Sequence, residues 1–254
     1  NFLWGFNYYR PNINQRLAIE NHEPDTEEFL MVFEKLIRQT NELYISFDDI
    51  DKTKIDSLVE FSYFGLAPVL DINYPLGKRR AKKITFSRFF AQAGISGYYG
   101  PFFNEIHVNS YVHPIEYPFV LAHEKAHQFG ITSEAEANFY AWLVCSKSNS
   151  KHLNYSANLV VLRFFIYQGY TLNKFENLVE KIEEPVKKDL RQIREHWQNL
   201  RNEKIDRAAT KVNDAYLKTN KIEKGVDDYY GIVQHVMDFE LDTAFQKRWN
   251  LLAE

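Results

Sequence analysis

The sequence predicts an α+β fold that is predominantly helical, with one small β-sheet in the first half of the chain. Apolar residues recur at the three- and four-residue spacing of amphipathic helices over much of the chain. Short strand-like segments occur only between about residues 68 and 109. From Pro118 onward the pattern is almost wholly helical. These observations place the sheet early in the chain and a helical part after it.

The first 64 residues predict an extended segment and two helices. Residues 1–24 are polar and aromatic, and we expect them to lie extended over other elements. Asp25 then caps a helix, with Glu28 three residues later as in a capping box. The apolar stripe of this helix consists of Phe29, Val32, Phe33, Leu36 and Ile37. A second helix covers about residues 51–64.

The middle of the chain supplies the predicted sheet. Residues 68–72 and 83–86 have the pattern of short strands, and residues 105–109 alternate in polarity as a strand does. Loops are indicated by Gly94, Gly97 and Gly100. The strand at 105–109 is either an ordinary edge strand or the edge along which a peptide lies, because an added strand binds through main-chain hydrogen bonds.

The second half predicts a series of helices. Pro118 fits the first turn of a helix that runs to about Phe129 and is stopped by Gly130. Ser133 caps the next helix, with Glu136 at the reciprocal capping position. Further helices cover about residues 155–168, 172–184, 185–218 and 226–254. We expect one domain over residues 1–254, in which 1–24 is the extended segment, 25–115 holds helices and the sheet, and 116–254 is the helical part.

Composition excludes several classes of protein. The chain of 254 residues carries 31 basic and 34 acidic residues, a net charge of −3, which argues against a nucleic-acid partner. Its single cysteine, Cys145, cannot form an internal disulfide, and we expect a small buried apolar side chain there. No segment reaches the roughly 18 consecutive apolar residues of a membrane span.

The motif that carries chemistry is H-E-x-x-H, formed by His123, Glu124 and His127 on a predicted helix. Histidines four residues apart leave one face of a helix and can share a metal ion. Glu124 is offset by one position, from which it can take the proton of a metal-bound water. Imidazole nitrogens with a carboxylate suit Zn²⁺, and a catalytic zinc requires a third protein ligand.

Two glutamates compete for the place of the third ligand. Glu134 shares a helix face with Asn138, which can hydrogen-bond a ligand from the second shell. Glu136 points to another side of the helix and already has a capping role, so Glu134 is favoured. A longer metzincin pattern would need histidine where this chain has Ser133.

These motifs resemble those of the gluzincin metallopeptidases, in which H-E-x-x-H is followed by E-x-x-A-N on the next helix. More specifically, the chain resembles a bacterial family that is catalogued as domain of unknown function 3810 and is expected to consist of membrane-anchored zinc peptidases. The resemblance covers most of the chain and is carried by residues 3–11, 94–102, 118–130 and 213–218.

The resemblance implies a zincin-like fold, with zinc bound by His123, His127 and Glu134 and with Glu124 as the base. It also implies a peptide or protein substrate, and a membrane anchor ahead of residues 1–24 that holds the catalytic domain on the extracytoplasmic side. The substrate and the oligomeric state do not follow from it.

Other residues are weaker candidates. Peptide hydrolysis needs a donor for the oxyanion, and the candidates are Tyr216, Tyr229 and His235, each of which can equally be a packed or surface residue. His107 and His113 precede the motif and can approach the metal, although a lone histidine is more often structural.

Three hypotheses follow for the whole chain. The first is an active zinc metallopeptidase. The second is a metal-binding but inactive relative that acts as a membrane-proximal binding or scaffold module. The third is a helical interaction domain with a fortuitous H-E-x-x-H. The presence of Glu124 favours the first, because an inactive protein has no need of the base.

Overall fold

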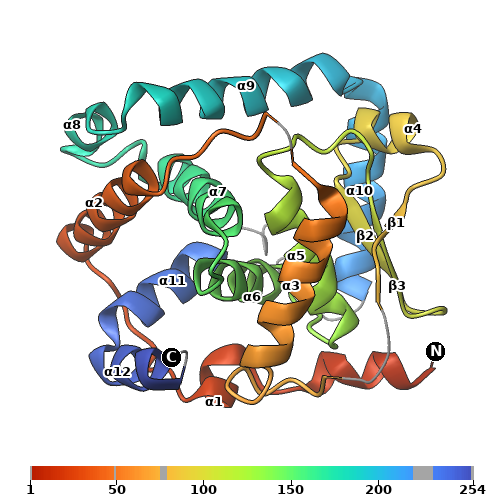
Figure 1. The fold of residues 1–254 in the computed structure, drawn as a ribbon, viewed down its shortest axis with the longest axis horizontal. Helices are drawn as coiled ribbons and strands as arrows, with labels where there is room; N and C mark the ends of the chain where they lie inside the picture. Colours follow the sequence, from red (N-terminus) through yellow and green to blue (C-terminus); the bar gives the residue numbers. More distant parts are fainter. Residues whose placement is uncertain (1, 49, 75–78, 220–230, 253–254) are drawn as a thin grey trace.

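Helices dominate the computed structural model, which describes residues 2–48, 50–74, 79–219 and 231–252 (Figure 1). The predicted α+β class, mostly helical with one small sheet, is confirmed. The elements in chain order are η1 (Phe2–Tyr9), α1 (Ile13–Leu17), α2 (Thr26–Glu42), α3 (Lys52–Leu66), β1 (Lys82–Lys83), α4 (Ser87–Gln92), β2 (Gly97–Gly100), β3 (Glu105–Val108), α5 (Tyr117–Gln128), α6 (Glu134–Ser146), α7 (Lys151–Gly169), α8 (Phe175–Glu180), α9 (Glu184–Leu200), α10 (Glu203–Thr219), α11 (Ile232–Leu241) and α12 (Thr243–Leu252).

The centre of the molecule is formed by α5, α6 and α7, around which the other helices and the sheet are arranged (Figure 1). Four alanines on the first two of these helices are fully buried: Ala122, Ala126, Ala137 and Ala141. Such small side chains let α5 and α6 approach closely. The metal motif therefore sits in the hydrophobic core and not on an exposed amphipathic helix.

The sheet has the strand order β1-β3-β2, with β1 parallel and β2 antiparallel to β3. Ile106 and Val108 are the buried residues of β3, whereas Glu105 and His107 are partly exposed. The predicted strand at 105–109 is confirmed, but the expectation that it forms the edge is wrong. It lies in the middle, because β1 and β2 pair with its two sides.

Several expected boundaries are also wrong. Residues 68–72 form a turn after α3 and not a strand, since Val69 and Leu70 donate backbone hydrogen bonds to Leu66. Their apolar side chains fill the core without joining the sheet. Of residues 83–86, only Lys83 belongs to β1. Gly97–Gly100, which the glycines suggested was a loop, is strand β2.

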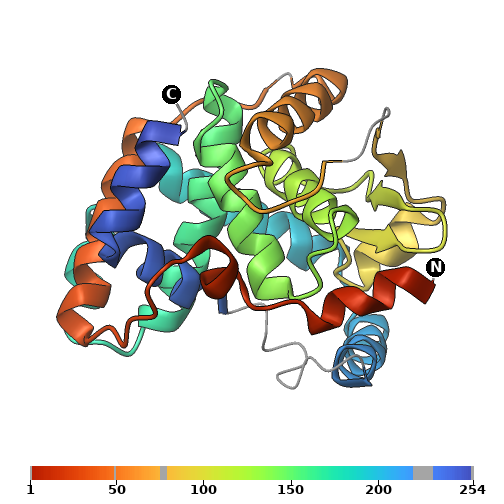
Figure 2. The same ribbon diagram turned by 90° about the horizontal axis from the view of Figure 1, so that it is seen from below.

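The N-terminal segment is helical where an extended chain was expected. Residues 2–9 form η1, and α1 begins where the Asn12 side chain accepts a hydrogen bond from the backbone of Gln15. Figure 1 shows this segment below α5 and α6, and the view from below in Figure 2 shows it running across them.

Two long predicted helices are each divided by a capping residue. The one expected at 185–218 breaks at Asn202, whose side chain accepts from the backbone of Lys204 and Ile205 and starts α10. The last one is split into α11 and α12 at Asp242, whose carboxylate accepts from the backbone of Phe245. The helix expected at 172–184 is the shorter α8.

The predictions for the start of the first helix and for the cysteine are confirmed. Asp25 and Glu28 form the complete capping box of α2. Cys145 is fully buried in α6. Within the described part of the chain, no helix is long and apolar enough to cross a membrane.

Candidate metal centre

Helix α5 presents both histidines of the motif to one side. The helix starts with Pro118 in its first turn, and the chain turns away at Gly130, which adopts a φ of +88°. His123 and His127 are both buried, and their Nε2 atoms are 3.1 Å apart. The i, i+4 spacing thus brings the two imidazoles together as predicted.

The third group comes from the first turn of α6. Ser133 caps this helix by accepting from the backbone of Glu136, and Glu134 follows as its first residue. One Glu134 oxygen, Oε2, lies 3.1 Å from Nε2 of His123 and 3.4 Å from Nε2 of His127. The three atoms form a nearly equilateral triangle.

This triangle has the size of a zinc site. Bonds of about 2.0–2.1 Å in a tetrahedron place neighbouring ligand atoms about 3.3 Å apart. The observed separations of 3.1, 3.1 and 3.4 Å match that value. The ligand atoms need no rearrangement beyond a few tenths of an ångström to hold the ion. Three protein ligands with a fourth position for water or substrate are the pattern of a catalytic zinc.

A backbone carbonyl fixes the orientation of one imidazole. Nδ1 of His127 donates to the carbonyl oxygen of Ile131 at 2.7 Å, because a carbonyl can only accept. Nε2 then faces Glu134 and His123. Partners of this kind set the tautomer and ring orientation of metal-binding histidines. The loop after α5 thus fixes the orientation in which His127 would bind a metal ion.

The charges of the cluster stabilise one another. Burial alone would lower the pKa of His127, but the Glu134 carboxylate raises it to about 9. Burial alone would raise the pKa of Glu134, but His127 and His123 hold it well below its usual range. Metal ions and protons compete for the lone pairs of such ligands, so metal binding at this cluster would depend on pH.

The proposed base lies beside the cluster. Glu124 is buried, and it belongs with His123 and His127 to a group whose ligand atoms all lie within 4.8 Å of one another. Burial raises the pKa of Glu124, an effect that His123 and His127 partly oppose. A raised pKa makes a carboxylate a better proton acceptor, as a general base requires.

The side chain of Glu124 packs against strand β2 at Gly97. A Cβ atom placed on Gly97 would stand 2.6 Å from Oε1 of Glu124 and 2.8 Å from its Cγ. Only glycine leaves room for the carboxylate in this position. Sequence reasoning treated Gly97 as a loop signal and missed this role, because the contact joins residues distant in the chain.

Of the two competing glutamates, Glu134 is the one whose carboxylate lies at the imidazoles. The carboxylate of Glu136 instead binds Arg16 and the backbone of Ile13. Asn138 is buried one turn after Glu134. Its hydrogen bond to a metal ligand stays a prediction.

Of the oxyanion candidates, only His235 has a side chain within the described part of the structure. Tyr216 belongs to α10, but its side chain is outside the described part of the structure, and Tyr229 lies outside the described residues altogether. His235 is on α11, where its ring packs 5.6 Å from the ring of Phe139. Their role as donors stays a prediction.

The other histidines have different surroundings. The ring of His107 stacks on Tyr98 at 4.7 Å, on the partly exposed side of the sheet. The ring of His113 faces that of His196 at 5.3 Å, beside α9. These contacts give both residues packing roles.

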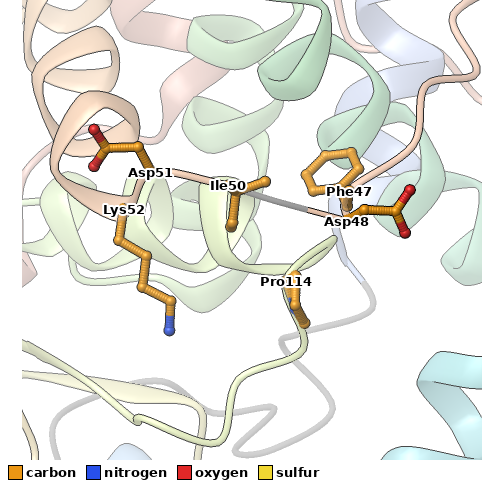
Figure 3. Close-up of a pocket in the computed structure, with 6 residues that line it drawn as sticks. All are labelled: Phe47, Asp48, Ile50, Asp51, Lys52 and Pro114. Atoms are coloured by element: carbon orange, nitrogen blue, oxygen red, sulfur yellow. The ribbon is translucent and has the colours of Figure 1, made fainter.

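A surface pocket lies between the segment before α3 and the segment before α5 (Figure 3). It is lined by Phe47, Asp48, Ile50, Asp51, Lys52 and Pro114. Figure 3 shows Asp48 and Asp51 pointing in opposite directions, and Lys52 pointing away from both. Its polar groups do not converge on a ligand, so it is a weaker candidate site than the buried cluster.

Sequence reasoning also missed the role of Lys125, which stands inside the motif. This lysine is completely buried, with Nζ 2.5 Å from Glu60 and 3.2 Å from Asp56, both on α3. It also donates to the carbonyl of Arg79 at 2.9 Å. The network holds the motif helix against α3. The signal in the sequence that could have indicated this network is a lysine that stands among apolar residues and residues of the motif.

Comparison with known proteins gives one match. The model of the family described as "Protein of unknown function (DUF3810)" matches residues 1–237. No curated protein and no solved structure matches the chain.

Proposed function

Because the chain belongs to the DUF3810 family, whose function is unknown, we propose its activity from the site itself: zinc-dependent hydrolysis of peptide bonds. The observation that carries the proposal is the triangle of His123, His127 and Glu134 ligand atoms, with a buried carboxylate beside it. Imidazole and carboxylate donors of this number and spacing are typical of catalytic zinc.

The chemistry divides between the metal and the protein. A zinc ion held by the three residues would polarise the scissile carbonyl and lower the pKa of water towards 7. Glu124 accepts a proton from the attacking water and returns it to the leaving amine. Burial of the site excludes bulk water, which strengthens the interactions of these charges. The raised pKa of Glu124 suits both proton transfers.

Strand β2 supports a peptide as the substrate. It lies at one end of the strand order, and its residue Gly97 contacts Glu124. An extended peptide added to this edge would bind through main-chain hydrogen bonds close to the base. The peptide-binding edge that was one of two interpretations of residues 105–109 is therefore proposed for the neighbouring strand β2.

Metal content and cleavage test the proposal together. We expect the purified protein to bind one Zn²⁺ per chain, and His123→Ala to lose it, while His22→Ala, outside the cluster, keeps it. Cleavage of a peptide library should fall by about 10²–10⁴-fold in Glu124→Gln with zinc retained. Equal zinc content in His123→Ala and wild type would refute the metal site. If the protein binds zinc but cleaves no peptide, the peptidase proposal fails and the metal-binding but inactive scaffold module is the function that remains.

A further inference from the structure

The placement of Glu134 depends on more than the motif. The two histidines stand four residues apart on a single helix, so helix geometry sets their separation. Glu134 belongs to a different helix and is reached through the loop at residues 129–133. Its position therefore depends on how that loop turns and how the start of α6 is held.

The N-terminal segment holds the beginning of this loop. Arg10 donates through Nη1 to the carbonyl of Phe129 at 3.5 Å. The side chain of Asn7 lies against Gly130, where a Cβ atom would meet it at 2.9 Å. Since Gly130 has a φ of +88°, any other residue there would be strained as well as crowded.

The same segment holds the first turn of α6. The backbone N–H of Ile13 donates to Oε1 of Glu136 at 2.8 Å, and Arg16 lies 2.5 Å from Oε2. Arg16 also donates to the hydroxyl of Tyr140, one turn further along, at 2.7 Å. Both carboxylate oxygens of Glu136, two residues from Glu134, are thus fixed by residues 13–16.

These contacts are shielded from water. The side chain of Arg16 is 5% exposed and that of Glu136 is 13% exposed. Loss of one partner of such a pair leaves the other charged group buried and unpaired. Such a pair should hold the start of α6 far more firmly than an exposed salt bridge can.

We propose that Arg16 and Glu136 are positioning residues of the metal centre, which keep Glu134 within coordinating distance of His123 and His127. This inference rests on the proposed function only in that Glu134 binds zinc. It makes the N-terminal segment a part of the metal centre, although that segment supplies no ligand.

The test compares Arg16, which lies on α1, with Arg248, which contacts the last residue of α1 from another helix. Arg16 contacts Glu136, whereas Arg248 of α12 donates to the carbonyl of Leu17 at 2.6 Å. Zinc affinity is measured by chelator competition for wild type, Arg16→Gln, Arg16→Lys and Arg248→Gln. The absorption spectrum of the Co²⁺-substituted proteins reports whether the carboxylate still coordinates.

We expect Arg16→Gln to bind zinc about 10- to 100-fold more weakly with an altered Co²⁺ spectrum, the range for loss of a supporting contact. Arg16→Lys should recover part of the affinity, and Arg248→Gln should match wild type. Equal zinc affinity in Arg16→Gln and Arg248→Gln would overturn the inference without contradicting the zinc site itself. If Arg16→Gln does not fold, Glu136→Gln, which keeps the size of the side chain, replaces it. Its zinc affinity is compared with that of Arg248→Gln in the same way. A wild type without zinc affinity would overturn the proposed function and this inference with it.

Discussion

Replacing Gly97 by alanine should disable the base while leaving the metal site in place. The new Cβ would stand 2.6 Å from Oε1 of Glu124 and 2.9 Å from its Cδ, whereas ordinary contacts begin near 3.4 Å. The carboxylate must therefore move by about 0.8 Å, beyond the tolerance of about 0.5 Å for productive geometry. A displacement near 1 Å costs about 100-fold in rate.

The matched control is Gly100→Ala in the same strand. Its Cβ would meet only the carbonyl oxygen of Glu105, at an ordinary 3.5 Å. The assay measures kcat on the best peptide of a library, together with zinc content. We expect Gly97→Ala to lose about 100-fold in kcat with one zinc retained, and Gly100→Ala to keep its activity. If the two variants were equally active, the contact between β2 and Glu124 would have no catalytic role.

The remaining predictions concern stability. Lys125→Met leaves Asp56 and Glu60 without their buried cation and should lower the free energy of unfolding by about 3–5 kcal/mol. Urea denaturation measures this free energy. The control Lys174→Met removes an exposed ion pair and should change the free energy of unfolding by at most about 1 kcal/mol. Equal effects of the two substitutions would contradict a stabilising role of the buried Lys125 network. Burial raises the pKa of Asp189, so its charge opposes folding above that pKa, and Asp189→Asn should gain stability relative to wild type as pH rises. Burial alone would raise the pKa of Asp242, but backbone hydrogen bonds from Glu20 and Phe245 lower it. The stability that the Asp242 carboxylate contributes is present above the usual aspartate pKa and disappears as pH falls. The decrease in stability caused by Asp242→Asn should therefore be smaller in acid. Parallel pH profiles of the two variants would refute these assignments.

Local rules predicted those features that depend on neighbours in the chain. The capping box at Asp25 and Glu28, the helix begun by Pro118, and the shared face of His123 and His127 all follow from spacing within one helix. Helix rotation also predicts that Glu134 and Glu136 point in different directions, and in the structure the two have different partners.

Contacts between distant segments escaped prediction. Strand β2 is rich in glycine, so its pattern resembles a loop, and only pairing with β3 makes it a strand. The fit of Gly97 to Glu124, the α3 partners of Lys125 and the hold of Arg16 on Glu136 each join residues far apart in sequence. The spacing of residues within a single helix or strand does not predict contacts between such distant residues.

The central claim is that His123, His127 and Glu134 together hold one zinc ion. X-ray absorption at the zinc edge of the purified, zinc-loaded protein tests it most directly. The structure predicts two imidazole nitrogens and a carboxylate oxygen at about 2.0–2.2 Å in wild type, and the loss of one imidazole signal in His127→Ala. A spectrum without imidazole scattering, or one unchanged in His127→Ala, would contradict the claim.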